Sequence, residues 1–197
     1  MNRTHATAIA TALMLAGLAA CTERPKERAD GGSAPIAETS GNVIGNPGFE
    51  TSEALFAPWV FNIHADPDAF VFTADNAFFK EGTVSLRVQR SRDEPFASVV
   101  QYINKDTLPA ARYRLSAWVR GENLQSPVYL HTAFFASSYQ MAMDGGPEHG
   151  LVGTFDWTRL EREITLPERL SHIETGVTTT GDGTLWIDSV ELVPISD

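Results

Sequence analysis

The sequence predicts an all-β domain, in which antiparallel strands form a two-sheet sandwich of the jelly-roll type. From position 43 onward, short runs rich in β-branched and aromatic residues alternate between apolar and polar with a period of two. Clusters of Gly, Pro and Asp separate these runs, and no stretch of about twelve residues keeps the apolar stripe of a helix. Because strands without intervening helices cannot form parallel βαβ units, we expect an antiparallel sandwich.

The candidate strands follow one another closely along the chain. They cover residues 59–64, 69–74, 83–90, 97–104, 111–120, 128–135, 158–166, 172–179 and 185–193. Breaks are expected at residues 123–127 and 144–147, and the Asp-Gly step within residues 181–183 predicts a hairpin between the last two strands. Residues 136–156 lack the pattern of a strand, so we expect a long loop there that is functional or mobile and able to roof a groove.

The strand at residues 111–120 shows most clearly which side chains face the core. Its apolar side consists of Tyr113, Leu115, Ala117 and Val119. Its other side consists of Arg114, Ser116, Trp118 and Arg120. An indole among arginines, opposite a side that is already apolar, predicts that Trp118 points outward or into a groove.

Composition limits the classes of partner. The chain has 197 residues, 15 Lys and Arg, 25 Asp and Glu, a formal net charge of −10 and one cysteine. This length supports one domain with a tail, and a single cysteine excludes a disulfide within the chain. The acidic balance repels phosphate backbones, which excludes nucleic acid as an expected partner, and a basic membrane-binding patch is equally absent. The oligomeric state stays open.

The N-terminus reads as a signal peptide over residues 1–20. Arg3 precedes an uncharged apolar run that is shorter than the roughly 20 residues a membrane-spanning helix needs. The run ends in Leu-Ala-Ala-Cys21, which resembles the lipobox of bacterial lipoproteins and implies lipidation of Cys21 and anchoring by its acyl chains. The alternative is an ordinary signal peptide in which Cys21 is incidental.

The lipoprotein resemblance also bears on location and on domain limits. Position 22 is Thr, not the aspartate that such proteins use for inner-membrane retention, which implies the outer membrane and leaves the leaflet open. Residues 21–42 are rich in charge, Gly, Pro and Ala and contain no aromatic residue, so we expect a disordered tether. The folded domain is then expected to cover residues 43–197.

Five segments, in order, resemble the family 4 and 9 carbohydrate-binding modules. They are Asn46-Pro47-Gly48-Phe49-Glu50, Lys80-Glu81-Gly82 with Ser85-Leu86-Arg87-Val88, Gln101 with the strand at 111–120, Trp157-Thr158 with residues 164–167, and the closing residues 185–192. The resemblance covers nearly the whole domain and implies a galactose-binding-like jelly roll. It departs from the family at Ser189, where a second aspartate often follows the first.

The same resemblance implies a structural calcium site. Carried over by position, its ligands are the carboxylates of Glu50 and Asp188 and the carbonyls of Gly48, Lys80 and Gly82. Calcium takes six to eight oxygen ligands, so a mixture of carboxylates and carbonyls suits it. The alternative is that Glu50 and Asp188 are ordinary acids at a turn and at a strand end.

Sugar recognition needs flat aromatic rings and planar hydrogen-bonding side chains. If Trp118 and Arg120 mark the face that points away from the core, strand alternation adds further candidates to that face. The expected carbohydrate-binding residues are Arg87, Gln101, Trp118, Arg120, Tyr129 and His131. The alternative for such aromatic residues is packing in a small core beneath loops, and we expect packing in the core or under loops for Trp59, Trp157 and Trp186.

No motif of a known catalytic class occurs in the chain. The sequence lacks nucleophile-elbow, zincin, phosphate-loop and dinucleotide fingerprints, and nothing places two acids at the separation that a glycosidase requires. His64, Asp66 and Asp68 are interpreted as a turn. The sequence thus favours a non-catalytic envelope lipoprotein that binds a glycan. The alternative is a structural or protein-interaction domain on the same scaffold.

Overall fold

The computed structural model describes residues 41–51 and 56–195, and every strand pair in them is antiparallel. The strands are β1 (Val60–Ile63), β2 (Phe70–Asp75), β3 (Ser85–Arg90), β4 (Ala97–Asn104), β5 (Arg112–Ala136), β6 (Tyr139–Asp144), β7 (Leu151–Thr165), β8 (His172–Thr179) and β9 (Thr184–Pro194). Two 3-10 turns, η1 (Lys105–Thr107) and η2 (Pro147–His149), are the helical elements of these residues. None of the described helical segments could span a bilayer. The predicted all-β fold is confirmed.

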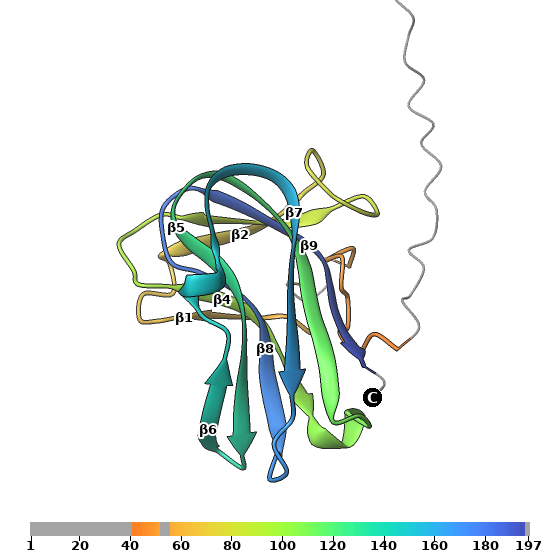
Figure 1. Ribbon diagram of the computed structural model, residues 1–197. Helices are drawn as coiled ribbons and strands as arrows, with labels where there is room; N and C mark the ends of the chain where they lie inside the picture. The colour runs from red at the N-terminus through yellow and green to blue at the C-terminus, as the bar shows by residue number, and fades with distance from the viewer. Residues whose placement is uncertain (1–40, 52–55, 196–197) are drawn as a thin grey trace, which may run out of the picture. The chain divides into compact units, whose positions relative to one another are not determined.

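Strand β5 belongs to both layers of the sandwich (Figure 1). Residues 112–122 of β5 pair with β7 and β9, whereas residues 128–136 pair with β8 and β6, and the beginning of β7 follows the bend through Leu124 and Val128. The change of partner occurs around Asn123, whose φ of 55° lies in the left-handed region that Asn tolerates. The first layer contains β2, β3, β9, residues 112–122 of β5 and residues 158–165 of β7. The second contains β1, β4, β8, residues 128–136 of β5, and β6.

The predicted break at residues 123–127 is wrong, because the chain bends there without leaving the sheet. Leu124 is buried and pairs with Gly153 of β7, and the Gln125 amide donates to the carbonyl of Asp182. The strands predicted at residues 111–120 and 128–135 are therefore one continuous strand, β5. The predicted hairpin at residues 181–183 is also wrong: β8 and β9 pair with opposite halves of β5, so the turn carries the chain from one layer to the other.

The expected long loop at residues 136–156 is instead mostly strand. It contains β6, η2 and the beginning of β7, with a tight turn at Ser137 and Ser138 that folds β6 back onto β5. Tyr139 and Met143 of β6 are exposed, so the segment lacks the alternation of a half-buried strand. The chain break predicted at residues 144–147 is confirmed, since β6 ends at Asp144 and η2 begins at Pro147.

The core lies between the two layers. Tyr113, Leu115, Ala117 and Val119 are all fully buried, as the alternation in this strand predicted. At one end of the sandwich Phe49 stacks on Trp59, with ring centroids 4.9 Å apart, and the Trp59 indole donates to the carbonyl of Asn46. The expected packing role of Trp59 is confirmed. Hydrogen bonds between the N-terminal segment and β9 begin with Asn42, one residue before the predicted start of the domain.

Basic residues are divided unequally between the two layers. The first layer carries Arg87, Arg90, Arg112, Arg114, Arg120, Arg159 and Arg162 on its strands. The strands of the second layer, over the residues defined above, carry neither Arg nor Lys. We therefore call the first layer the arginine sheet and the second the arginine-free sheet.

Candidate functional site

The six predicted carbohydrate-binding residues do not share one face. Trp118, Arg120 and Arg87 lie on the outer side of the arginine sheet. There Trp186 of β9 is the register partner of Arg87 on one neighbouring strand and of Arg120 on the other. Tyr129 and His131 lie on the outer side of the arginine-free sheet, opposite buried Val128 and Leu130 on the same strand. The inward and outward assignment from strand alternation was right, but the assumption of a common face was wrong because β5 crosses between the layers.

Gln101 belongs to neither outer face. Its side chain is buried, and both of its amide atoms are bonded to the backbone of Gly45. The Gly45 amide donates to Oε1 over 3.1 Å, and Nε2 donates to the Gly45 carbonyl over 2.5 Å. The Gln101 side chain thus bonds to the backbone of the N-terminal segment in the way that a neighbouring strand would. Its amide oxygen and nitrogen are both occupied and are not available to a ligand.

A polar cluster occupies the outer face of the arginine-free sheet. Glu174 lies at its centre and accepts a hydrogen bond from Asn62 Nδ2 over 3.2 Å, and the same nitrogen is 3.1 Å from the Tyr102 hydroxyl. Oε1 of Glu174 is 3.7 Å from His131 Nε2, while Nδ1 of that ring is 2.6 Å from the Thr178 hydroxyl. Four strands, β1, β4, β5 and β8, therefore contribute to one cluster.

The charge state of this cluster follows from its contacts. The hydrogen bond with His131 lowers the pKa of Glu174, and burial opposes that shift only in part. Burial, followed by the nearby Glu174 charge, raises the pKa of the Tyr102 hydroxyl despite its bond with Asn62. Glu174 is thus a carboxylate and Tyr102 a neutral phenol at neutral pH. With no Arg or Lys on these strands, the face presents hydrogen-bond acceptors and aromatic edges without a fixed positive charge.

Sequence reasoning placed only Tyr129 and His131 in this region and missed Asn62, Tyr102 and Glu174. Alternation within β4 and β8 predicts that Tyr102 and Glu174 share a side, and the register places them directly opposite each other. That β1 pairs with the far edge of β4, which brings Asn62 to them, could not be deduced from local pattern. Tyr102 is 51% exposed, so its ring is available to a ligand.

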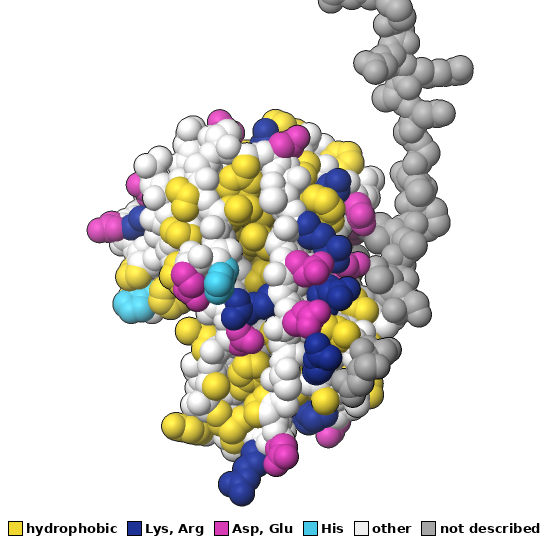
Figure 2. All heavy atoms as spheres, in the orientation of Figure 1, with side chains coloured by type: hydrophobic (Ala, Val, Ile, Leu, Met, Phe, Trp, Pro, Cys, Tyr) yellow, Lys and Arg dark blue, Asp and Glu magenta, His cyan; other side chains and the backbone are white. Residues whose placement is uncertain are grey.

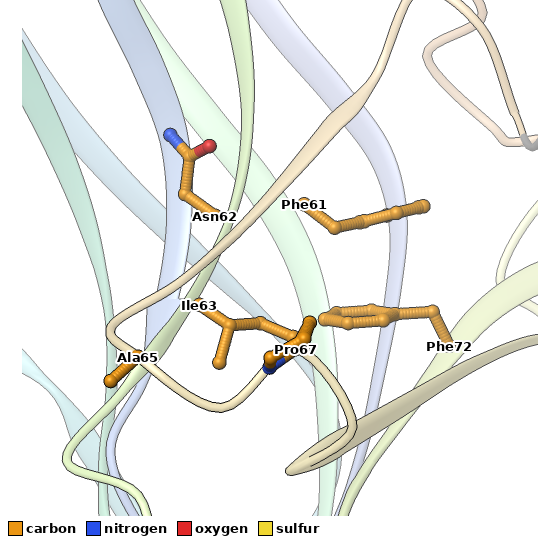
Figure 3. A pocket seen from close by; sticks show the side chains of 6 residues that line it. All are labelled: Phe61, Asn62, Ile63, Ala65, Pro67 and Phe72. Atoms are coloured by element: carbon orange, nitrogen blue, oxygen red, sulfur yellow. The ribbon is translucent and has the colours of Figure 1, made fainter.

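A pocket of about 380 Å³ adjoins the cluster at the β1 edge (Figure 3). It is lined by Phe61, Asn62, Ile63, Ala65, Pro67 and Phe72. The rings of Phe61 and Phe72 stack with centroids 4.2 Å apart, which joins the two end strands, β1 and β2, of the pairing order. Asn62 contacts Glu174 on the outer face, whereas Phe61, Ile63 and Phe72 pack against the core, so the pocket lies at the edge between the layers and meets the candidate face only at Asn62.

The acids expected to bind calcium do come together. A β-carbon added to Gly48 would lie 3.4 Å from Asp188 Oδ1 and 3.7 Å from Glu50 Oε1, and Asp188 is fully buried. Asp188 accepts the amides of Lys80, Glu81 and Ser189, whereas Glu50 accepts those of Thr83 and Val84. Burial, opposed by these hydrogen bonds and helped by the Glu50 charge, raises the pKa of Asp188 to about 6.

The two carboxylates lie near each other, but the groups around them are mainly hydrogen-bond donors and not yet the oxygens of a calcium site. Neither acid forms an ion pair with Lys or Arg in the part of the chain that the structure describes, and the backbone amides that they accept offset their mutual repulsion in part. The Lys80 backbone presents its amide, not its carbonyl, to Asp188. No group of three or more His, Cys, Asp or Glu side chains suited to a metal occurs among residues 41–51 and 56–195. Any calcium here would depend on backbone oxygens.

The remaining predicted features fall elsewhere. Asp66 accepts the Asp68 amide and binds Arg92, which confirms that this acidic segment is a turn. Cys21 and residues 1–40 lie outside the described residues. Figure 2 shows a band of alternating basic and acidic side chains over β5 and β7, where Arg114 and Arg159 both pair with Glu161.

Comparison with known proteins identifies the fold. No protein-family model and no curated protein matches the sequence. Among solved structures, the carbohydrate-binding module TmCBM61, in complex with β-1,4-galactotriose, is 21% identical, with a TM-score of 0.55 over 78% of this chain and 99% of that one. The chain has the jelly-roll fold of such modules.

Two further structures support this conclusion. The C-terminal family 22 carbohydrate-binding module of Clostridium thermocellum Xyn10B is 17% identical, with a TM-score of 0.57 over 79% of this chain and 96% of that one. The enzymatically active domain of tailspike protein 4 of bacteriophage CBA120 is 15% identical, with a TM-score of 0.62, but this chain spans only 21% of it. The fold therefore occurs both as a separate module and within larger proteins. The assignment to families 4 and 9 stays a prediction.

Proposed function

We propose that this protein is a non-catalytic carbohydrate-binding protein of the cell envelope, which binds a glycan on the outer face of the arginine-free sheet. The observation that carries the proposal is the cluster of Glu174, Asn62, His131 and exposed Tyr102. A carboxylate and an amide bind sugar hydroxyls in pairs, and an exposed phenol ring covers the apolar face of a pyranose. Structural neighbours that bind β-1,4-galactotriose or xylan support the ligand class.

We interpret the cluster as a binding site and not as a catalytic one. Glycosidases use two carboxyl groups flanking the scissile bond, roughly 5 to 9.5 Å apart. In the described residues Glu174 contacts Asn62, Tyr102 and His131, and none of these partners is a carboxyl group. The cluster therefore supports the binding of a sugar more directly than its cleavage.

Binding of the full chain to β-1,4-galactan and to xylan in affinity gels, followed by calorimetry, tests the proposal. We expect Glu174→Gln and Tyr102→Ala each to weaken binding by about tenfold, which corresponds to about 1.4 kcal/mol. Trp118→Ala is the matched control, because this ring lies on the opposite sheet. If Trp118→Ala abolishes binding and Tyr102→Ala does not, the glycan site lies on the other face. If no glycan binds, the structural or protein-interaction role takes its place.

The proposed location depends on Cys21. Lipidation of this residue would tether the domain to the outer membrane through residues 21–42, with the acyl chains inserted in the bilayer. We expect wild-type protein in the membrane fraction of a bacterial host and Cys21→Ser in the soluble fraction. Mass spectrometry of the mature N-terminus checks the result. A Cys21→Ser protein that stays in the membrane fraction would refute the anchor.

We further propose a structural calcium ion at Glu50 and Asp188, completed by the carbonyls of Gly48, Lys80 and Gly82. The ion would supply the positive charge that two adjacent carboxylates lack. We expect a chelator to lower the unfolding midpoint of the full chain and added CaCl2 to restore it. Glu50→Gln is expected to remove this response, whereas Asp66→Asn, an acid in a distant turn, retains it. An unchanged midpoint on chelation contradicts the site.

A further inference from the structure

The outer face of the arginine sheet carries a row of cations and aromatic rings far from the proposed glycan face. Arg87 of β3, Trp186 of β9 and Arg120 of β5 are directly opposite one another in the register. The guanidinium carbon of Arg120 lies 4.8 Å from the Trp186 ring and 4.2 Å from the Phe78 ring. Arg87 lies 6.0 Å from Trp186 on its other side. Cation–π contacts thus hold both arginines against the sheet.

The rings beneath the arginines are themselves fixed. Trp186 is only 3% exposed, and its indole donates to Asp75 Oδ2 over 2.8 Å. Phe78 packs edge-on against Trp186, and the Asp75 carboxylate accepts the Phe78 amide. A ligand that reached this row would therefore meet guanidinium groups already in position and would lose little affinity to ordering them.

Both arginines have unused hydrogen-bonding capacity. Arg87 Nε and Arg120 Nη1 are buried without a partner in the described residues. The carboxylate near Arg120 is that of exposed Asp156, 3.8 Å from its Nε. Other arginines of the sheet are paired: Arg114 and Arg159 lie 3.4 and 3.5 Å from Glu161. Buried donors without acceptors cost free energy, so this row is suited to an incoming acceptor.

The surroundings indicate the chemistry of that acceptor. A guanidinium stacked on a ring keeps its edge for in-plane, bidentate bonds to a carboxylate or sulfate. Lys80, whose ammonium is 4.1 Å from the Trp118 ring, adds a third cation beside the row. Gln89 and Thr184, hydrogen-bonded to each other on the next row, offer groups for sugar hydroxyls. Asp75 and Asp156 limit the local positive charge, and a chain of net charge −10 disfavours polyphosphates and anionic bilayers.

We infer that the Arg87–Trp186–Arg120 row is a second binding site, which takes a sugar residue bearing an isolated carboxylate or sulfate group. The two sites lie on opposite layers of the sandwich and use no common residue. The second site stands whether or not a neutral glycan binds at Tyr102 and Glu174. A protein with both sites could hold two different stretches of polysaccharide at once.

The test is calorimetry of the full chain in low salt with four probes: a galactan oligosaccharide that ends in one galacturonic acid residue, a galactan oligosaccharide with one sulfate group, a neutral galactan oligosaccharide and sodium sulfate. The double variant Arg87→Gln/Arg120→Gln removes the row. The double variant Arg114→Gln/Arg159→Gln removes the same charge from the paired arginines of the same sheet. Unfolding midpoints of both variants check that the fold is intact.

We expect at least one acidic oligosaccharide to bind more tightly than the neutral one at this site, with affinity that falls as NaCl is added. Arg87→Gln/Arg120→Gln should weaken this binding by about tenfold or more, whereas the Arg114 and Arg159 variant and Tyr102→Ala leave it unchanged. Should the glutamine variant not fold, Arg87→Lys/Arg120→Lys replaces it. A smaller loss of affinity is expected, because lysine keeps the positive charge and loses only the planar, bidentate guanidinium group.

Three results would overturn the inference. Acidic oligosaccharides that bind no more tightly than neutral galactan would exclude an oxyanion site. An affinity unchanged by both the glutamine and the lysine variants would place any acidic ligand elsewhere. Sodium sulfate that binds as tightly as the sulfated oligosaccharide would show a simple anion site with no role for the sugar. Loss of neutral galactan binding in Tyr102→Ala bears only on the other face.

Discussion

At the scale of single residues, two acids show how environment decides role. Asp188 is buried beside Glu50, and its pKa is raised to about 6, mainly by burial and further by the Glu50 charge. Glu174 is also largely buried, but its hydrogen bonds to His131 and Tyr102 lower its pKa. Burial dominates the first acid and hydrogen bonding the second, so the two carboxyl groups are shifted in opposite directions.

The lowered pKa of Glu174 predicts a dependence of stability on pH. Because the folded state binds this proton less readily than the unfolded state, the carboxylate stabilises the fold above about pH 4.5, and that contribution is lost as the pH falls through the folded-state pKa. We expect Glu174→Gln to have a lower free energy of unfolding than wild type at pH 7 and to differ less at pH 3.5. Urea unfolding at both pH values measures this. An equal difference at both would show that its ionisation plays no part.

The neighbouring residues Gly145 and Gly146 are predicted to differ in how much an alanine substitution lowers the free energy of unfolding. Gly145 has a φ of 97°, and a β-carbon there would lie 2.1 Å from the Leu130 carbonyl oxygen, so Gly145→Ala should cost about 2 kcal/mol and disturb the β6 hairpin. At Gly146, the nearest atoms are those of the flexible Glu148 carboxylate. Gly146→Ala is therefore the matched control, with a much smaller expected loss in urea unfolding. Equal losses would contradict the packing of this turn.

At the scale of elements, strand β5 decides which predictions from sequence hold. Period-two alternation is local, and it correctly identified most strands and their inward residues, such as Tyr113 and Val119. The partners of a strand are not local, because Asn123 and Gly121 allow one continuous strand to pass from one layer to the other. For this reason the sequence could place Trp118 and Tyr129 on outward positions but could not show that these positions face opposite sides of the molecule.

The β6 hairpin was missed for a different reason. Both of its sides are largely exposed, so selection for apolar residues on alternate positions is weak and Tyr139 and Met143 lie on the surface. The pairing with β5 supplies the hydrogen bonds of this strand, and the turn at Ser137, with a φ of 58°, fixes its register. A strand of this kind leaves little trace in local sequence.

At the scale of the whole molecule, charge is separated between the two layers. The arginine sheet neutralises most of its charges in cross-strand pairs such as Arg112 with Glu163. The arginine-free sheet instead carries mostly uncharged polar and aromatic residues and two acids, Glu174 within the cluster and Asp144 at the end of β6, which pairs with Arg162 of β7. This separation gives the two faces different chemistry, so they are expected to prefer different ligands.

The account depends most on the claim that a glycan binds the arginine-free sheet. Titration of isotope-labelled full chain with a β-1,4-galactan oligosaccharide or a xylan oligosaccharide, followed by amide chemical shifts, tests it directly. We predict that the largest changes fall on Asn62, Tyr102, His131 and Glu174, with little change on β3 and β9. Changes confined to Arg87, Trp186 and Arg120, or no change at saturating concentrations of either glycan, would contradict it.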